Sequence, residues 1–473
     1  MLRPNGGVES WKKGRHVAGR IARVWQAVFT AHPARTVVSA FALVIILGSA
    51  ALMLPAASAD GSVTSPLTAL FTATSAVCVT GLVVVDTAEH WSTFGELLIL
   101  ALIQVGGFGI MTMASLLALL VSGRLRLRMQ LTAAAETKSL GLGDVRRVLL
   151  GVAGCTLVVE LAVGAFLAQR LRFGYGFGFG EAVYSGLFHS VSAFNNAGFG
   201  LHGDSITRYA QDPWVTMPIA VAVILGGLGF PVLLELMRHR NRQRTTGLRN
   251  WSLHTRLTLV TSAALLVVGT VLTCLLEWTN PGTLGPFDWG QKVLNGFFYS
   301  AMSRTAGFNA IDMGALNAST VLFTCTLMFI GGGSAGTAGG IKVTTFSVLA
   351  AAMAAEVRGE PNSTVMGRRL APHALRQALT VALLGVGLVI AATLALLTVT
   401  KAPAEAVLFE AVSAFGTVGL STGITADIPV SGQLILILLM FIGRLGPITL
   451  VSSLALRERV RRYQLPEERP VIG

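Results

Sequence analysis

The sequence predicts an all-α membrane protein built from four copies of one unit around a pseudo-fourfold pore, and three observations support this fold class. Of the 473 residues, 53% are hydrophobic and 12% are charged, whereas about a quarter of the residues in a typical soluble domain are charged. Apolar runs long enough to span a bilayer recur along the chain. One pattern, centred on a glycine, occurs four times. Fourfold repetition inside a membrane protein indicates a ring around an axis, and therefore a pore.

In each copy of this pattern a Phe precedes the glycine by ten residues, and a large apolar residue follows the glycine directly. The four glycines are Gly81, Gly198, Gly307 and Gly419, at separations of 117, 109 and 112 residues. Three copies carry Ser-Ala six and five residues before the glycine, whereas the third copy has Ala301-Met302 there. A single membrane glycine is most often a packing residue. It is therefore the shared register that predicts a common role.

Each predicted repeat consists of an apolar run, the segment from Phe to Gly, and a second apolar run. The first runs cover about 36–56, 149–167, 257–276 and 377–398, and the second runs cover about 96–121, 214–237, 317–346 and 432–456. The middle segment is too short to cross a bilayer, since residues 71–79 would form a helix of only about 12 Å. We therefore predict eight transmembrane helices and four re-entrant pore loops, in the order M1–P–M2. Non-helical backbone at that depth must be buried in protein or line water, which again favours a pore.

The basic residues predict the orientation in the membrane. Of the 36 Lys and Arg, 28 lie before residue 36, within 122–148, 237–257 and 356–376, or after residue 456. Cytoplasmic segments are enriched in Lys and Arg, so both termini and three loops are predicted to face the cytoplasm of a multi-pass cell-membrane protein. The same distribution accounts for the net charge of +13 without any role for nucleic acid. The N-terminal region forms either an interfacial amphipathic helix or a solvated tail.

These features define the predicted boundaries. The segments are a basic N-terminus at 1–35, repeat 1 at 36–121, a loop at 122–148, repeat 2 at 149–237, a loop at 238–256, repeat 3 at 257–346, a loop at 347–376, repeat 4 at 377–456 and a C-terminus at 457–473. No cytoplasmic segment exceeds about 35 residues. We therefore expect no nucleotide-binding domain in this chain, and any regulation by nucleotide is expected to act through a separate protein.

The residues around the four glycines are candidates for a cation filter. A potassium ion that enters a dry site must exchange water for protein oxygens, and rings of backbone carbonyls do this in potassium channels. Glycine permits the backbone angles that aim successive carbonyls inward, and the negative end of a preceding half-helix favours a cation. K+ at this filter is the only metal expected. The candidate filter residues are Val79, Thr80, Gly81, Asn196, Ala197, Gly198, Thr305, Ala306, Gly307, Thr417, Val418 and Gly419.

The motifs TSAVCVTGLVVVDT, SAFNNAGFGL, SRTAGFNAID and SAFGTVGLSTGIT resemble the four pore loops of the Trk/Ktr/HKT superfamily of potassium transporters. The resemblance covers about residues 36–456 and is strongest to the membrane subunit of the Ktr branch, since the two extra N-terminal helices typical of the Trk branch are not apparent. It implies one pore per subunit, a homodimer, and gating by a KtrA-like cytoplasmic ring of nucleotide-binding RCK subunits (regulators of potassium conductance). It also implies that the four register glycines are the selectivity glycines. Each loop keeps one glycine where potassium channels have two, so the discrimination against Na+ is left open.

The segment 331–340, which reads GGGSAGTAGG, is the candidate gate. Six of its ten residues are glycine, the poorest helix former after proline, so we predict that the helix breaks here. Close packing on an intact helix is the alternative, and it is also expected for the glycines at 106–109, 226–229 and 443–446. The resemblance implies an intramembrane loop below the filter that blocks the pore and moves on activation. A dinucleotide fingerprint is excluded, because no strand–turn–helix unit surrounds the segment. The candidate gate residues are Gly331, Gly332, Gly333, Ser334, Ala335, Gly336, Thr337, Ala338, Gly339, Gly340 and Arg444.

Four further charged features have open roles. Arg444 lies well inside the last span, where a charge is costly and usually faces a cavity; the resemblance implies a gate residue that lines the pore, and the alternative is an arginine that reaches the inner surface. Lys342 follows the soft segment and has the same two alternatives. Glu160 neutralises a buried base, faces solvent or relays protons. Four loop acids either concentrate cations at the outer mouth or are ordinary solvated residues: Asp86, Asp204, Asp312 and Asp427.

The sequence therefore predicts passive, channel-like potassium uptake, gated from the cytoplasm. The alternative is a symporter coupled to Na+ or to protons, and whether Na+ is an activator or a coupling ion is left open. An enzyme is not expected, because we find no nucleophile–base set, no metal-ligand spacing and no phosphate loop in a suitable context. No cofactor is expected in this chain. The four cysteines are expected to pack as small apolar side chains in the membrane segments; they are Cys78, Cys155, Cys274 and Cys325.

Overall fold

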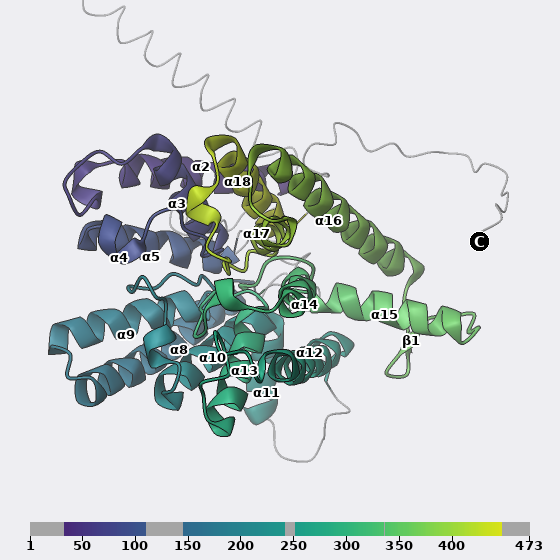
Figure 1. The fold of residues 1–473 in the computed structure, drawn as a ribbon. Coiled ribbons are helices and arrows are strands. Elements are labelled where there is room, and N and C mark those ends of the chain that lie inside the picture. The colour runs from purple at the N-terminus through teal and green to yellow at the C-terminus, as the bar shows by residue number, and fades with distance from the viewer. Residues whose placement is uncertain (1–32, 110–144, 242–250, 335, 447–473) are drawn as a thin grey trace, which may run out of the picture.

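The computed structural model describes residues 33–109, 145–241, 251–334 and 336–446, which fold almost entirely into α-helices. A long helix, a short helix, a non-helical glycine segment and a further helix follow one another four times (Figure 1). The predicted all-α class is confirmed. Residues 1–32, 110–144, 242–250, 335 and 447–473 lie outside the described residues. They include most of the basic N-terminus, most of the loop at 122–148, about half of the loop at 238–256, the candidate gate residue Ala335, the whole C-terminus at 457–473, and the ends of the runs at 96–121 and 432–456.

The four units contain these elements. The first has α2 (Pro33–Leu52), the 3-10 helix η1 (Pro55–Ala57), α3 (Pro66–Cys78), α4 (Thr87–His90) and α5 (Thr93–Gly107). The second has α8 (Val145–Gly174), α9 (Phe179–Phe194), η3 (Thr207–Tyr209), α10 (Pro213–Leu228) and α11 (Phe230–Asn241). The third has α12 (Leu253–Glu277), α13 (Trp289–Met302), η5 (Met313–Ala315), α14 (Ala318–Phe329) and α15 (Val343–Val357). The fourth has α16 (Pro372–Val399), α17 (Ala404–Gly416), η6 (Thr425–Asp427) and α18 (Val430–Leu445).

The short helices α3 and α13 begin at strong local start signals. Ser65 precedes α3, and its Oγ accepts a hydrogen bond of 3.2 Å from the Thr68 N–H, while Pro66 occupies the first turn. Asp288 and Gln291 form a capping box at the start of α13. Because α3 begins at Pro66 rather than at Phe71, its 13 residues extend about 20 Å rather than the predicted 12 Å. It is still shorter than the hydrocarbon core of about 30 Å.

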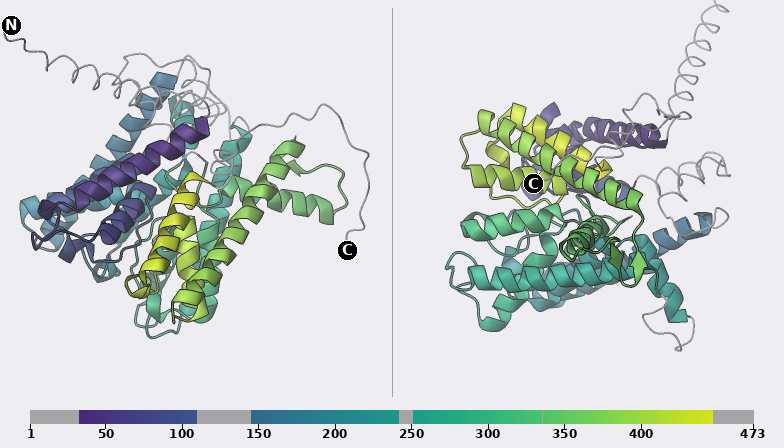
Figure 2. Two further views of the ribbon diagram at one scale, coloured as in Figure 1. Left: turned by 90° about the horizontal axis from the view of Figure 1, so that it is seen from above. Right: turned by 90° about the vertical axis from the view of Figure 1, so that its right-hand side faces the viewer.

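The helices close into a ring. The second helix of each unit packs against the short helix of the next unit, so that α5 contacts α9, α10 contacts α13, α14 contacts α17, and α18 contacts α3. The last contact joins the fourth unit back to the first. Figure 2 shows the helices from two further sides. The four units therefore surround a common centre.

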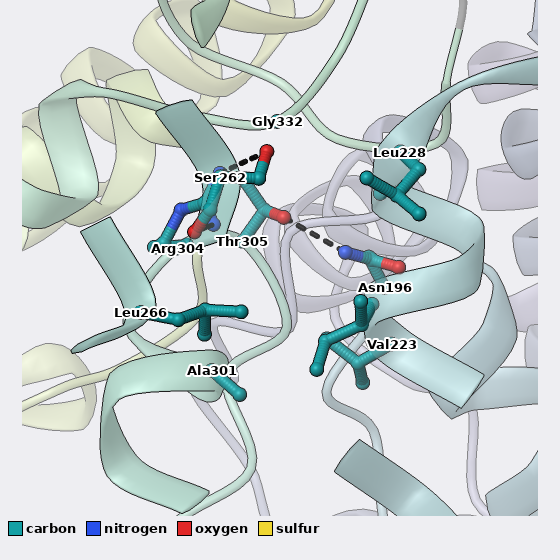
Figure 3. Close-up of a pocket in the computed structure, with 11 residues that line it drawn as sticks. Asn196, Val223, Leu228, Ser262, Leu266, Ala301, Arg304, Thr305 and Gly332 are labelled. Carbon is teal, nitrogen blue, oxygen red and sulfur yellow. Dashed lines mark hydrogen bonds between the residues drawn. The ribbon is translucent and has the colours of Figure 1, made fainter. Parts of the chain in front are cut away.

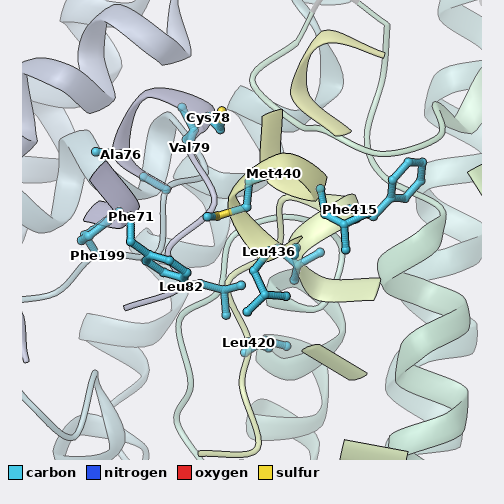
Figure 4. Packing of buried hydrophobic residues seen from close by; sticks show 14 of the residues in the cluster. Phe71, Ala76, Cys78, Val79, Leu82, Phe199, Phe415, Leu420, Leu436 and Met440 are labelled. Atoms are coloured by element: carbon cyan, nitrogen blue, oxygen red, sulfur yellow. The ribbon is translucent and has the colours of Figure 1, made fainter. Parts of the chain in front are cut away.

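Buried apolar residues pair the units in two halves. One cluster lies mainly between the first and fourth units and includes Phe71, Leu82, Leu436 and Met440 (Figure 4). A second cluster lies between the second and third units and includes Phe194 and Phe298. Figure 1 shows the same division, with α2–α5 and α16–α18 on one side and α8–α13 on the other. In a bilayer the lipid tails are as apolar as these side chains, so it is their close van der Waals packing that stabilises the ring.

Fewer membrane-spanning helices can be identified by length and composition than the eight that the sequence predicts. In the part of the chain that the structure describes, three helices are long and apolar enough to cross a membrane, namely Leu150–Gly174, Leu253–Glu277 and Pro372–Val399. The second run at 214–237 is divided between α10 and α11, which are bent by 101° relative to each other. Gly229, between them, has a φ of +94°, and a Cβ there would lie 2.5 Å from the Ser334 carbonyl oxygen. The chain therefore bends where the segment 331–340 packs against it.

The predicted loop at 347–376 contains regular structure. Helix α15 continues to Val357, and strands β1 (Thr364–Val365) and β2 (Arg368–Arg369) form an antiparallel hairpin. Its turn consists of Met366 and Gly367, both with positive φ, as a tight two-residue hairpin requires. Helix α15 and the hairpin extend away from the rest of the molecule (Figure 1).

Candidate functional site

The four glycine segments, 79–81, 196–198, 305–307 and 417–419, meet in a closed ring. A Cβ atom on Gly198 would lie 2.6 Å from the carbonyl oxygen of Ala306. Cβ atoms on the other register glycines would overlap equivalent oxygens: that of Ala197 from Gly81, that of Val418 from Gly307, and that of Thr80 from Gly419. Each glycine thus faces the carbonyl that precedes the glycine of the next segment. Only glycine allows this approach, so the register predicted from the sequence has a steric cause.

The backbone follows a similar path in the first, second and fourth segments, and the third segment departs from it at Thr305. The register glycines have φ values between +70° and +91°, which L-residues with a Cβ rarely adopt. Two residues earlier, each segment also holds a non-glycine residue at positive φ: Val79 (56°), Asn196 (60°), Thr305 (148°) and Thr417 (49°). Such conformations cost about 1–3 kcal/mol each and persist only where the surroundings impose them. Strain at the same offset in four copies indicates a functional constraint.

The serines of the repeated pattern hold this backbone in place. Ser75 Oγ accepts from the Gly81 N–H, and Ser413 Oγ accepts from the Gly419 N–H, both at 3.1 Å. Ser192 occupies the same position in the second unit, but its Oγ has no partner among the described residues. In the third unit Ala301 replaces the serine, and the Gly307 N–H instead donates to the Met302 carbonyl at 3.4 Å.

The short helices direct their C-terminal ends at the ring. Helices α3, α9, α13 and α17 end three to five residues before their register glycines. The C-terminal end of a helix carries a partial negative charge. Four such ends around one ring of carbonyl groups create an environment that favours a cation.

Glycines of the second helices pack against these helix ends. In three units a glycine of the second helix touches the end of the short helix. A Cβ on Gly106, Gly226 or Gly443 would overlap a carbonyl oxygen that lies four residues before the register glycine of the same unit. These carbonyl oxygens belong to Val77, Phe194 and Phe415. The close-packing role expected for these three glycines therefore agrees with the geometry.

The segment 331–340 is not helical, as its glycine content predicts. Helix α14 ends at Phe329 and α15 begins at Val343. The Gly333 N–H donates to the Gly227 carbonyl at 2.7 Å, and the Thr337 N–H donates to the Gly226 carbonyl at 3.2 Å. These bonds hold the segment against the C-terminal end of α10.

The same segment touches two of the glycine segments. The Asn196 side-chain amide lies 3.1 Å from Thr337 Oγ1 and 2.8 Å from Thr305 Oγ1. On the other side, a Cβ on Gly339 would overlap Thr417 Oγ1. The segment therefore contacts the second and the fourth glycine segments directly.

Two basic residues bind backbone carbonyl groups at this level. Arg444, at the end of α18, donates to the carbonyl of Thr337 and to that of Gly106, the latter at 2.5 Å. It thus joins the candidate gate to the first unit and does not extend to the inner surface. Lys342 Nζ donates to the Ala338 carbonyl at 2.5 Å and to the Gly339 carbonyl at 3.4 Å.

Glu160 belongs to a buried polar network behind the second glycine segment. Its carboxylate accepts from Gln104 Nε2 at 3.2 Å and from Asn195 Nδ2 at 2.9 Å, and its side chain is 3% exposed. Of its expected roles, neutralisation of a base and exposure to solvent both disagree with these contacts. Asn195 stands three residues before the register glycine, an offset that sequence inspection did not use.

Two further buried charges beside the ring were not predicted. Glu410 in α17 accepts from Ser421 Oγ, two residues after Gly419, and from Thr425 Oγ1 at 3.1 Å. Arg304, next to Thr305, lines a cavity of about 30 Å³ between the second and third units (Figure 3). Glu410 lies nine residues before its register glycine, and Arg304 lies three residues before its own. The equivalent positions of the other three units hold no Asp, Glu, Lys or Arg. A comparison of the four copies position by position would have found them.

Local contacts explain three of the loop acids. Asp86 and Asp312 accept from backbone N–H groups two residues later, at 2.8 Å each, and Asp204 forms an ion pair of 2.8 Å with Arg208. These are ordinary turn and cap roles. Among the described residues there is also no group of three or more His, Cys, Asp or Glu side chains that could hold a metal ion.

Known proteins resemble this chain along most of its length. The TrkH family model, described as a cation transport protein, matches residues 19–459. The Ktr system potassium uptake protein B of Bacillus subtilis (strain 168) is 38% identical over 430 residues, which cover 90% of this chain and 94% of that protein. The potassium/sodium uptake protein NtpJ of Enterococcus hirae is 34% identical over 447 residues, which cover 93% and 97%. In fold, the potassium transporter TrkH from Vibrio parahaemolyticus is similar, with a TM-score of 0.70 over 89% of this chain and 84% of that one, at 18% identity.

These relatives are transporters rather than enzymes, and they confirm the resemblance that the pore-loop motifs indicated. Apolar helices, a closed ring of glycine segments and the family match agree with one another. The chain is a multi-pass membrane protein and belongs to the TrkH family of cation transport proteins.

Proposed function

We propose that this chain takes up potassium across the cell membrane through a channel-like pore. The observation that carries the proposal is the closed ring of glycine segments, in which each register glycine faces a carbonyl of the next segment. A dehydrated potassium ion requires such carbonyl oxygens. The printed names of relatives, potassium uptake proteins in Bacillus subtilis and Vibrio alginolyticus, support potassium as the cargo.

The topology that fits this function is four M1–P–M2 repeats with eight spans and both termini in the cytoplasm. Three spans are long apolar helices, and the bent pair α10–α11 supplies a fourth. Helices α2, α5, α14 with α15, and α18 are the remaining candidates, since each contains a shorter apolar stretch. The short helices α3, α9, α13 and α17 are the re-entrant elements.

The gate in this proposal is the segment 331–340 together with Arg444. The segment lies against glycine segments 196–198 and 417–419, and Arg444 fixes it to Gly106. A positive charge beside a cation path also raises the barrier to passage. Opening would require Arg444 to release the Thr337 carbonyl.

Regulation would come from a cytoplasmic ring of RCK subunits docked on a homodimer of this chain. The proposed docking surface comprises the basic loops at 122–148, 237–257 and 356–376. In the described part of that surface, the β1–β2 hairpin presents the exposed Arg368 and Arg369. Copurification of RCK subunits with the wild type but not with the Arg368→Glu/Arg369→Glu variant would support this docking site. Equal recovery with both would exclude the hairpin.

The experiment that tests the transport function is rubidium uptake in a host that lacks potassium uptake. The wild type should restore uptake, and a variant with serine at Gly81, Gly198, Gly307 and Gly419 should not, at equal membrane abundance. A chain with serine at Gly61, Gly176 and Gly423 is the matched control, because all three are positive-φ glycines outside the proposed docking surface with no atom near their Cβ positions. Uptake that survives replacement of the four register glycines would refute the proposal.

A symporter coupled to Na+ or protons is the second candidate. The specific observations are the buried Glu160 carboxylate, hydrogen-bonded only to amide groups among the described side chains, and the printed name of the relative NtpJ. Reversal potentials across defined ion gradients distinguish the two functions. A passive pore follows the potassium gradient alone, whereas a symporter shifts with the Na+ or proton gradient, and Glu160→Gln would abolish that shift.

A further inference from the structure

Arg304 is a buried cation that joins three parts of the third unit. Its side chain is 8% exposed. Nη1 donates to the Ser262 carbonyl at 3.2 Å, and Nη2 donates to Ser262 Oγ and to the Gly331 carbonyl, both at 3.3 Å. The guanidinium thus connects the third glycine segment, helix α12 and the first residue of the segment 331–340.

No carboxylate balances this charge in the described part of the chain. The ion pairs found there involve Arg170, Arg208 and Arg358, and Arg304 Nε has no partner. Burial of an uncompensated charge inside a membrane protein is costly, so such residues usually serve function. A guanidinium also presents a rigid, planar set of donors, which suits simultaneous contact with several oxygens better than a lysine does.

The third unit is also the one in which the glycine segment lacks its serine. In the first and fourth units a serine hydroxyl fixes the register glycine N–H at 3.1 Å. With Ala301 at this position, the Gly307 N–H has only the long 3.4 Å bond to Met302. Side chains on two sides of the third segment position it instead: the Asn196 amide lies 2.8 Å from Thr305 Oγ1, and Arg304 donates to Ser262 of α12.

We propose that Arg304 is a positioning residue that couples the third glycine segment to the segment 331–340, so that movement of the gate changes cation discrimination in the ring. This inference rests on the proposed potassium transport. When the segment moves, Gly331 leaves Arg304, whose guanidinium is then bonded to Ser262 alone, and the backbone that joins Arg304 to Thr305 can shift with it. The cavity between Asn196, Thr305 and Gly332 offers room for that displacement (Figure 3).

The test uses the full-length protein in liposomes and three variants: Arg304→Gln, Arg304→Lys, and Arg304→Gln combined with Ala301→Ser. Two quantities are measured, namely the preference for Rb+ over Na+ in flux, and amide hydrogen exchange of residues 330–343. Loss of hydrogen bonds to a charged group should lower the Rb+ preference by about tenfold in Arg304→Gln and accelerate exchange in 330–334. Arg304→Lys should show the same direction of change, because a lysine keeps the charge but not the planar set of donors.

The double variant separates the two ends of the proposed coupling. The Ala301→Ser change would supply the hydroxyl that the first and fourth units use, so the Rb+ preference should recover while the fast exchange of 330–334 persists. A folded Arg304→Gln protein with wild-type preference and exchange overturns the inference, and so does a wild-type result for Arg304→Lys. If Arg304→Gln does not fold, Arg304→Lys decides. Absence of Rb+ flux in the wild type would instead refute the transport function, and the inference with it.

Discussion

Replacement of Gly198 by alanine should abolish selective transport, whereas the same change at Gly61 should not. Both glycines have a φ of +71°, so both variants place an alanine in the same unfavourable backbone conformation. The neighbours differ. A Cβ on Gly61 has nothing within 4 Å, while a Cβ on Gly198 lies 2.6 Å from the Ala306 carbonyl oxygen and 3.1 Å from Gly307 Cα. The pair therefore separates backbone strain from disturbance of the ring.

The magnitude follows from these contacts. The left-handed conformation costs an alanine about 1–2 kcal/mol relative to glycine, and this applies to both variants. Ordinary van der Waals contact begins at 3.4 Å, so the 2.6 Å approach in Gly198→Ala must be relieved by a displacement of about 0.8 Å. The atom displaced is a carbonyl oxygen of the candidate filter. An added barrier of about 1.4 kcal/mol or more would slow Rb+ flux by at least about tenfold.

The assay is Rb+ flux and Rb+-to-Na+ preference in liposomes, with thermal unfolding measured on the same preparations. We expect a loss of stability in both variants, larger in Gly198→Ala because of the added overlap, and a loss of flux or preference in Gly198→Ala alone. If Gly198→Ala transports with the rate and preference of Gly61→Ala, the carbonyl groups of the ring do not contact the ion. That result would refute the filter.

Three further predictions use matched variants. Ser75→Ala and Ser413→Ala remove the acceptors of the register glycine N–H groups and should cost about 0.5–1.5 kcal/mol each in thermal unfolding, whereas Ser192→Ala, with no partner for its Oγ among the described residues, should cost less; equal losses in all three would contradict the role of these bonds. Arg444→Ala removes the contacts to Thr337 and Gly106 and should raise Rb+ flux without the regulatory partner, while unchanged or lower flux would argue against a gate. The new Cβ in Gly443→Ala overlaps the Phe415 carbonyl and should destabilise the protein. Gly387→Ala lies on an open face of α16 and should stabilise it by about 0.5–1 kcal/mol. A change of stability with the same sign in both variants would show that the close packing at Gly443 does not contribute to stability.

Much of the ring could be predicted from the sequence, because its backbone conformation constrains residue type. A positive φ combined with a carbonyl at contact distance leaves only glycine at positions 81, 198, 307 and 419. The serine six residues earlier has a local role, bonding within its own segment, so it also repeats. Likewise, the glycine content of 331–340 alone predicts that the helix is interrupted there. Local rules of this kind are readable without knowledge of the fold.

The remaining parts depend on contacts between units, which the sequence does not display. The 101° bend at Gly229 arises where 331–340, a hundred residues later, packs against α10. Glu160 resembles a lone charge in an apolar run until the fold brings Gln104 and Asn195 to it. Arg304 reads as one basic residue in a loop motif, and only its contact with Gly331 relates it to the gate.

The symmetry of the backbone and the asymmetry of the side chains suggest different roles. Each of the four segments places the same carbonyl in the ring, which is what coordination of a spherical ion requires. The residues three positions before the register glycines differ completely, being Cys78, Asn195, Arg304 and Gly416. The gate that we propose at 331–340 is a single segment of the third unit, so it cannot act equally on four identical neighbours. It needs particular partners, and these must come from positions where the copies have diverged. On this reasoning, coordination of the ion depends on what the four units share, and its control depends on where they differ.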